Sequence, residues 1–168
     1  VFLVILPLTF HAVYGVVLSV ASRPNVGPYP YNRNWMYFAQ RLTGIITFAF
    51  VIWHLSHYWV PKLTGELATA DFYPALAADL SSTQGGVPYR ALGYVAGVAA
   101  ASFHLANGLW GFCCTWGITV TRRAQRRSAT LFGVVGLLVF FLGANAALFF
   151  AAGLTASPFS LGAAAAAP

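Results

Sequence analysis

Four long apolar stretches, separated by polar connections, dominate the chain. They cover residues 1–21, 35–60, 88–117 and 128–153. Because an α-helix rises about 1.5 Å per residue, about 20 apolar residues are enough to cross the hydrocarbon core of a bilayer. The pattern therefore predicts an all-α protein in which four transmembrane helices form one domain, with a bend at Pro7 in the first helix.

The second apolar stretch has the clearest features of a membrane span. Aromatic residues lie at both of its edges, where they suit the interface between lipid and water. These residues are Trp35, Tyr37, Tyr58 and Trp59. Arg41 and His54 lie between the two edges, where an ionisable side chain is costly. Each of the two is therefore a candidate functional residue.

The connections differ in length and composition. Residues 22–34 form a short loop rich in Pro, Gly, Asn and Tyr, and residues 118–127 form a basic loop. Residues 61–87 form the longest connection, in which 73–80 are expected to be a short helix at the membrane interface. The tail 154–168 ends in an alanine run and is expected to be frayed.

Charged residues are few, and their two signs are separated. Only 7% of the 168 residues are charged and 59% are hydrophobic, whereas about 25% of the residues in soluble domains are charged. Six arginines lie in the first and third connections, and all three acids lie in 61–87. Because Lys and Arg near span ends stay in the cytoplasm, the first and third connections are predicted to be cytoplasmic and the acidic one external. The basic residues flank spans instead of covering a soluble surface, which argues against nucleic-acid binding.

Two pairs of small residues in the third stretch indicate helix packing. Cys113 and Cys114 are adjacent and form neither CxxC nor CxxCH, so they do not indicate a zinc site or a covalently attached haem. Gly93 and Gly97 have the GxxxG spacing that lets two membrane helices approach closely.

Two histidines on different spans lie at matching depth. Estimated from the helical rise, His11 lies about 16 Å and His104 about 20 Å from the cytoplasmic ends of their helices. Two neutral imidazoles that face each other across a helix bundle can supply both axial ligands of a haem iron. Gly15 and Gly108 follow one turn later on the same faces, where a flat macrocycle needs room. The alternative is that each histidine only donates a hydrogen bond to a neighbouring helix.

His54 lies deeper, about 28 Å from the cytoplasmic side, at a depth shared only by His57. These two follow each other on one helix face and cannot bind opposite faces of one haem. The chain begins with Val1 inside an apolar run, so a further upstream helix is expected. A ligand partner of His54 would be a histidine in the outer half of that helix. His57 is expected to be an interfacial polar residue or to contact a quinone headgroup or a propionate.

Other polar residues near the histidines have two possible roles each. Arg41 lies about 9 Å inside the cytoplasmic edge, from where it can pair with a haem propionate or extend to the lipid headgroups. Four further side chains can either donate hydrogen bonds around the cofactor or take part in ordinary helix packing: Gln40, Thr43, Asn107 and Trp110.

Three segments carry a resemblance to one family. They are HAVYG from His11, NWMYFAQRLTGIITF from Asn34 with the later Trp53 and His54, and FHLANGLWGFCCTWGITVT from Phe103. All three are similar to the di-haem cytochrome b subunit that anchors bacterial succinate dehydrogenases of the Bacillus type. The similarity covers nearly the whole chain through the fourth span.

The resemblance implies a subunit with five transmembrane helices, two b-type haems and a quinone site in the bacterial cell membrane. His11 and His104 would be the axial ligands of the haem nearer to the cytoplasm. His54 would be one ligand of the distal haem, and its partner would belong to the helix before Val1. Flavoprotein and iron-sulphur subunits would bind at the cytoplasmic face, and this subunit would relay electrons to quinone without a succinate or flavin site of its own.

Two other functions fit the same residues. A cytochrome b anchor of another quinone-linked dehydrogenase or hydrogenase would keep the histidines and change the soluble partner, which copurification would identify. A haem-free transport or structural subunit of the membrane would use the histidines for helix packing, and a reduced-minus-oxidised optical spectrum would identify it.

Overall fold

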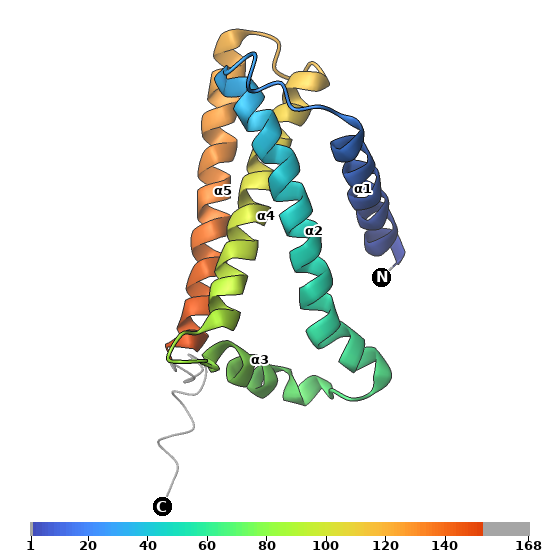
Figure 1. The fold of residues 1–168 in the computed structure, drawn as a ribbon, viewed down its shortest axis with the longest axis vertical. Coiled ribbons are helices and arrows are strands. Elements are labelled where there is room, and N and C mark those ends of the chain that lie inside the picture. The colour runs from blue at the N-terminus through green and yellow to red at the C-terminus, as the bar shows by residue number, and fades with distance from the viewer. Residues whose placement is uncertain (1, 153–168) are drawn as a thin grey trace, which may run out of the picture.

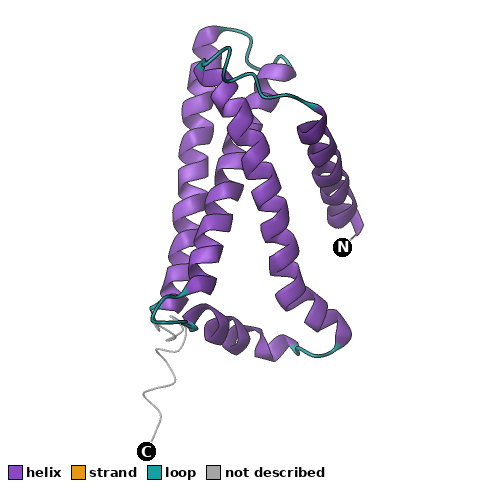
Figure 2. Cartoon of the chain, viewed as in Figure 1, coloured by secondary structure: helices purple, strands orange, loops and turns teal. Residues whose placement is uncertain are grey.

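The computed structural model describes residues 2–152, which are helical apart from short connections. Five α-helices follow one another along the chain: α1 (Phe2–Ala21), α2 (Asn32–Thr64), α3 (Phe72–Ser81), α4 (Tyr89–Thr115) and α5 (Arg122–Ala151). One turn of 3-10 helix, η1 (Thr69–Asp71), precedes α3. Figure 2 shows no β-strand in this part of the chain, so the predicted all-α class is confirmed. The tail predicted to be frayed, 154–168, lies outside the described residues.

The helices form an antiparallel arrangement with two distinct ends (Figure 1). α4 and α5 lie side by side, α2 packs against α4, and α1 lies along the outside of α2. The connections α1–α2 and α4–α5 lie at the same end, as predicted, and a hydrogen bond of 2.8 Å from Arg33 Nη2 to Gln125 Oε1 joins the two regions. We call this the arginine-rich end; six arginines lie at or near it: Arg23, Arg33, Arg122, Arg123, Arg126 and Arg127. The opposite end, across which α3 lies, is the α3 end.

Four of the described helices, α1, α2, α4 and α5, are long and apolar enough to cross a membrane, which confirms the predicted number of spans. The short helix predicted at 73–80 is α3, at 72–81.

Two helix boundaries differ from the prediction by four residues or more. α2 continues through Pro61 to Thr64, because a proline near a helix end costs only one hydrogen bond and Gly65, at φ +80°, supplies a left-handed cap. α5 begins at Arg122, so the four arginines predicted to lie in a loop form its first two turns. Thr121 caps this helix by accepting a hydrogen bond of 3.1 Å from the Ala124 N–H.

Small residues bring α4 and α5 together. A Cβ on Gly136 would lie 2.7 Å from the Cβ of Ala106, and a Cβ on Gly143 would lie 2.7 Å from Val98 Cγ1. Neither distance is compatible with a side chain, so these glycines set how closely the helices pack. Since lipid gives no hydrophobic driving force between helices, such close van der Waals contact is a main source of association in membranes.

The GxxxG pair of α4 meets aromatic rings of α2. A Cβ on Gly97 would lie 2.3 Å from Phe50 Cγ and Cδ2, and one on Gly93 would lie 3.7 Å from the Trp53 ring. The close approach of two helices that the glycine spacing predicts is therefore a contact between α4 and aromatic rings of α2. Phe50 and Trp53 join α2 to α4 near the α3 end through this contact.

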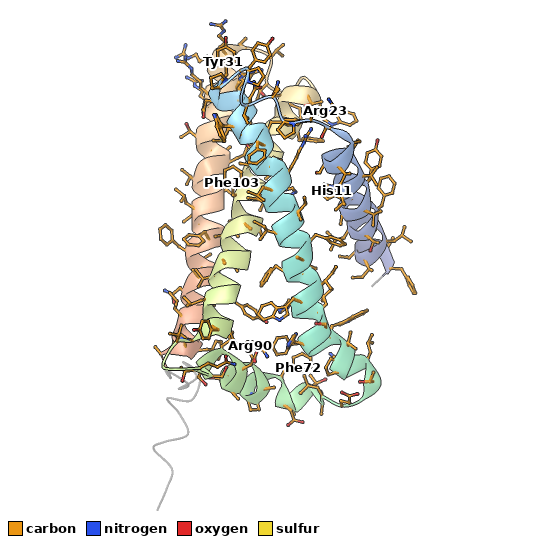
Figure 3. All side chains as sticks on the ribbon, viewed as in Figure 1. His11, Arg23, Tyr31, Phe72, Arg90 and Phe103 are labelled. Atoms are coloured by element: carbon orange, nitrogen blue, oxygen red, sulfur yellow. The ribbon has the colours of Figure 1, made fainter. Side chains whose placement is uncertain are left out.

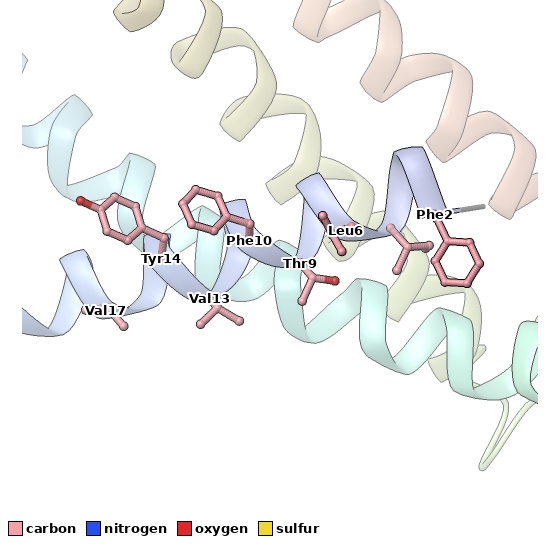
Figure 4. A pocket seen from close by; sticks show the side chains of 8 residues that line it. Phe2, Leu6, Thr9, Phe10, Val13, Tyr14 and Val17 are labelled. Atoms are coloured by element: carbon pink, nitrogen blue, oxygen red, sulfur yellow. The ribbon is translucent and has the colours of Figure 1, made fainter.

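Helix α1 is the least enclosed of the four long helices. None of its described residues is buried. Figure 4 shows one of its faces, where eight side chains line an open apolar groove of about 660 Å³: Phe2, Ile5, Leu6, Thr9, Phe10, Val13, Tyr14 and Val17. His11 does not line this groove; its ring lies near His104 of α4.

Candidate functional site

The two histidines predicted to pair lie close together between α1 and α4. The ring centroids of His11 and His104 are 6.1 Å apart, and the ring planes are inclined at 76°. The His104 side chain is partly buried, whereas that of His11 is exposed, and Figure 3 shows His11 on α1 beside the bundle. The depth argument from the sequence is thus matched by the distance in the structure.

Hydrogen bonds to Gln40 of α2 fix the position and tautomer of His104. Nδ1 of His104 lies 3.0 Å from the carbonyl oxygen of Gln40. Because a carbonyl oxygen only accepts, Nδ1 must carry a hydrogen, and Nε2 then has a free lone pair in the neutral ring. The side-chain amide of Gln40 donates back to the carbonyl oxygen of His104 at 3.1 Å. A histidine ligand to a metal needs this kind of support at its second nitrogen.

Gly44, one turn after Gln40 on α2, lies against the ring of His104. A Cβ on Gly44 would lie 2.8 Å from Cε1 and 3.2 Å from Nδ1 of that ring. Gly44 was not among the predicted site residues. Its signal in the sequence is the spacing Gln40-x-x-x-Gly44, which puts a hydrogen-bonding residue and an open space on one face of α2.

Gln40 also connects the site to Asn107. Asn107 Nδ2 donates to Gln40 Oε1 at 2.8 Å and approaches the carbonyl oxygen of Met36 at 3.3 Å. Thr43, the other candidate donor on α2, bonds within its own helix to the Ala39 carbonyl at 2.7 Å. Gln40 and Asn107 therefore hold α2 and α4 in register next to His104.

The two predicted glycines have different surroundings. Nothing lies within 4 Å of a Cβ on Gly15, so the surface of α1 one turn after His11 is open. A Cβ on Gly108 would lie 3.1 Å from Gln40 Nε2. Gly108 thus makes room for the Gln40 side chain at the contact of α4 with α2.

His54 lies at a second position, nearer to the α3 end. Its Nδ1 is 2.9 Å from the hydroxyl oxygen of Tyr94 on α4. The His54 ring also packs against Phe50 and Tyr58 of its own helix. Tyr94 is buried and was not predicted; a tyrosine in an apolar helix gives no sign in the sequence of the residue that it faces.

The donor set suits a metal that is already held by a macrocycle. Within residues 2–152 no group of three or more His, Cys, Asp or Glu side chains could hold a metal ion alone. Two imidazoles on separate helices, one with a fixed Nδ1–H, fit axial ligation of a haem iron instead. The open surface at Gly15 is compatible with a flat group beside it.

Comparison with known proteins decides the family. The sequence profile described as succinate dehydrogenase/fumarate reductase transmembrane subunit matches residues 24–144. The chain belongs to this family. It is also 39% identical over 146 residues to the succinate dehydrogenase cytochrome b558 subunit of Bacillus subtilis (strain 168), a match that covers 87% of this chain and 68% of that relative. No solved structure gives a significant match. The subunit is therefore a multi-pass component of a membrane-bound enzyme complex.

Arg41 of the subunit turns toward the arginine-rich end. Its guanidinium lies over the ring of Tyr37, 3.9 Å from the centroid, and Nη2 is hydrogen-bonded to the Tyr37 hydroxyl. Tyr37 is one turn earlier on α2, so the side chain extends along its helix as a snorkelling arginine does. The partly buried position leaves the guanidinium beside the bundle.

Trp110 contacts the beginning of α5. Its indole N–H donates to the Gln125 carbonyl at 3.1 Å, and the guanidinium of Arg33 lies 5.7 Å from its ring centroid. Trp110 and Asn107 both line a groove of about 440 Å³ between α2, α4 and α5, to which α1 contributes no residue. These two predicted cofactor contacts thus lie on the side of α4 that faces α2 and α5.

His57 of the subunit has hydrogen-bond partners at both nitrogens. Nδ1 is 2.9 Å from the Trp53 carbonyl oxygen, and Arg90 Nη1 donates to Nε2 at 2.9 Å. Because arginine only donates, the lone pair of Nε2 is occupied. Arg90 also forms a salt bridge of 3.4 Å with Asp79 of α3. His57 therefore belongs to a polar cluster with Arg90 and Asp79 at the surface, and Figure 3 shows Arg90 at the α3 end.

Proposed function

We propose that the subunit is the haem b-containing membrane anchor of a succinate:quinone oxidoreductase and relays electrons from an iron-sulphur subunit to quinone. The observation that carries the proposal is the approach of His11 and His104 to a ring distance of 6.1 Å. The relative from Bacillus subtilis is itself named as a cytochrome b558 subunit, which supports a haem in this subunit as well.

The residues of the His11–His104 site would bind the haem iron and orient its histidine ligands. His11 and His104 would bind the iron through their Nε2 atoms, and the Gln40 carbonyl would keep the His104 ring in the required tautomer. Gly44 would leave room for that ring in front of α2. The chemistry that haem b supplies when bound is reversible transfer of single electrons. Arg41 is the candidate partner of a propionate, because its guanidinium lies beside the bundle on the neighbouring face of α2.

A second haem is proposed at His54, which would make two in the complete subunit. Support comes from the hydrogen bond between its Nδ1 and Tyr94, which leaves Nε2 for a ligand role. His57 is a poor candidate for the opposite ligand, because both of its nitrogens are engaged and it follows His54 on the same helix. The partner would be a histidine of a helix upstream of Val1, in the half of that helix near the α3 end.

The proposed partners bind at the arginine-rich end. We assign this end to the cytoplasm on the positive-inside rule and expect the iron-sulphur and flavoprotein subunits there. The first haem would then be nearer to those subunits, and the His54 site nearer to the outer face. Quinone is the proposed electron acceptor, and the flavoprotein would carry the succinate site.

The test is substitution of each histidine in the full-length subunit, with low-temperature optical and EPR spectra of the membrane complex. His11→Ala and His104→Ala should each abolish the low-spin signal of one and the same haem. His57→Ala is the matched control and should leave that signal intact. If His104→Ala keeps a bis-histidine spectrum, or if the parent gives no haem signal, the proposal is wrong.

A further inference from the structure

Tyr94 is held rigidly against His54. Its ring is perpendicular to that of His54, at 83° and 5.6 Å between centroids, and its hydroxyl oxygen lies 2.9 Å from His54 Nδ1. The side chain is only 9% exposed. Phe50 and Trp53 pack on it from α2, with centroid distances of 5.5 and 5.0 Å.

The glycines of α4 make this packing possible. Phe50 lies on Gly97, three residues after Tyr94, and Trp53 lies near Gly93, the residue directly before Tyr94. A side chain at Gly97 would displace Phe50, which contacts both Tyr94 and His54. The position of the Tyr94 hydroxyl is thus determined by the shape of the interface between α2 and α4.

A second polar contact, between Tyr58 and Asp79, lies next to His54 on the side of the α3 end. The Tyr58 hydroxyl donates to Asp79 Oδ2 at 2.8 Å, and Asp79 is also paired with Arg90. Tyr58 packs on the His54 ring with a centroid distance of 5.5 Å. His54 is therefore flanked by aromatic rings of α2 and α4, and within residues 2–152 Tyr94 is its one polar side-chain partner.

We propose that Tyr94 is the positioning residue of His54: its hydroxyl oxygen accepts the Nδ1–H, orients Nε2 toward the iron and lowers the reduction potential of that haem. The inference rests on the proposed function, in which His54 is a haem ligand. A hydrogen bond accepted from Nδ1–H increases the basicity of a ligating imidazole, and a more basic ligand favours ferric over ferrous iron.

The two histidines on α2 and α4 thus have different kinds of partner. His104 donates to a main-chain carbonyl, which no side-chain substitution removes. His54 is hydrogen-bonded to a tyrosine hydroxyl, and Tyr94→Phe removes this hydroxyl while it keeps the ring. The two haem potentials should therefore respond independently to this substitution.

The test is a redox titration of both haems in the full-length complex that carries Tyr94→Phe, followed by optical and EPR spectroscopy. We expect the midpoint potential of the haem that His54→Ala removes to become more positive, and its EPR signal to change. The haem that His104→Ala removes should keep its potential. Tyr89→Phe, on an exposed tyrosine of the same helix, is the control and should change neither.

Several outcomes separate this inference from the proposed function. Selective loss of the His54 haem in Tyr94→Phe also supports the inference, and Tyr94→Gln, whose amide oxygen can accept the same hydrogen, should then restore part of it. Unchanged potentials in Tyr94→Phe, or an equal change in both haems, overturn the role of Tyr94 alone. If His54→Ala leaves both haem signals intact, the ligand assignment of the proposed function fails instead.

Discussion

Gly44 of α2 and His104 of α4 are in direct contact, and the contact has no room for another carbon atom. A Cβ on Gly44 would lie 2.8 Å from Cε1 of the His104 ring. The same ring is held from α2 by the Gln40 carbonyl, so it cannot move away without losing a hydrogen bond of 3.0 Å. α2 thereby fixes a histidine that belongs to a different helix.

Gly44→Ala should therefore lower haem content at the His11–His104 site. Overpacking of this kind costs about 1–3 kcal/mol in a rigid site, and the strain falls on the ligand ring. Haem stoichiometry and the thermal stability of the detergent-solubilised subunit are the measurements. Gly111→Ala is the control, because a Cβ there meets nothing within 4 Å and the gain in helix propensity is the same. Equal haem content in the two variants would contradict the prediction.

Gly97→Ala should destabilise the contact between α2 and α4 whether or not a cofactor is bound. A Cβ there would lie 2.3 Å from the Phe50 ring, so the ring must leave its position, at a cost of about 1–3 kcal/mol. Phe50→Leu in the same chain should recover part of the loss. Unfolding in mixed micelles gives the free energies for a double-mutant cycle. Strict additivity of the two substitutions would show that the ring and the glycine do not meet.

Tyr58→Phe should loosen α3. The buried Tyr58 hydroxyl donates to the Asp79 carboxylate, a contact worth about 1.5–3 kcal/mol when the acceptor is charged. Arg90→Gln should cost less than about 1 kcal/mol, because its salt bridge with Asp79 is partly exposed. Hydrogen exchange of residues 72–81 is the measurement. Faster exchange in Arg90→Gln than in Tyr58→Phe would show that the salt bridge stabilises α3 more than the Tyr58 hydrogen bond does.

Single cysteines should report the orientation of the subunit. In a chain with Cys113 and Cys114 replaced by Ser, a cysteine at Asp71 should react with an impermeant reagent from outside the cell. A cysteine at Arg123 should react only after the membrane is opened, because arginines near span ends resist translocation. Both positions are exposed in the structure. Labelling at Arg123 but not at Asp71 from outside would require the opposite orientation.

The sequence predicts depth along the membrane well, because a bilayer imposes one length on every span. His11 and His104 could be matched in this way, and His54 could be recognised as lying deeper. The sequence does not state how each helix is rotated about its axis. The contacts of Gly44, Gln40 and Tyr94 depend on that rotation, which is why the first and last were missed and Gln40 was only one of four candidate donors.

Local signals explain the two boundaries that were predicted wrongly. Pro61 indicates a helix end in general, but the chain has a glycine four residues later that caps α2 beyond it. The run of arginines predicts a loop because it is polar. Thr121 directly before it is a good N-cap residue and, with the bond to Ala124, begins α5 there. Polarity alone does not distinguish a loop from a helix that extends out of the membrane.

The early start of α5 has an electrostatic consequence. Arg122, Arg123, Arg126 and Arg127 lie in its first two turns, and no acidic residue lies in the first turn. Cations at a helix N-terminus oppose the helix dipole, so these residues weaken the end of the helix that carries them. An acidic surface that binds there would relieve this unfavourable interaction and would meet side chains whose backbone is already ordered. Docking of such a surface and the stability of α5 would therefore be coupled, and its loss would show first as fraying of this helix end.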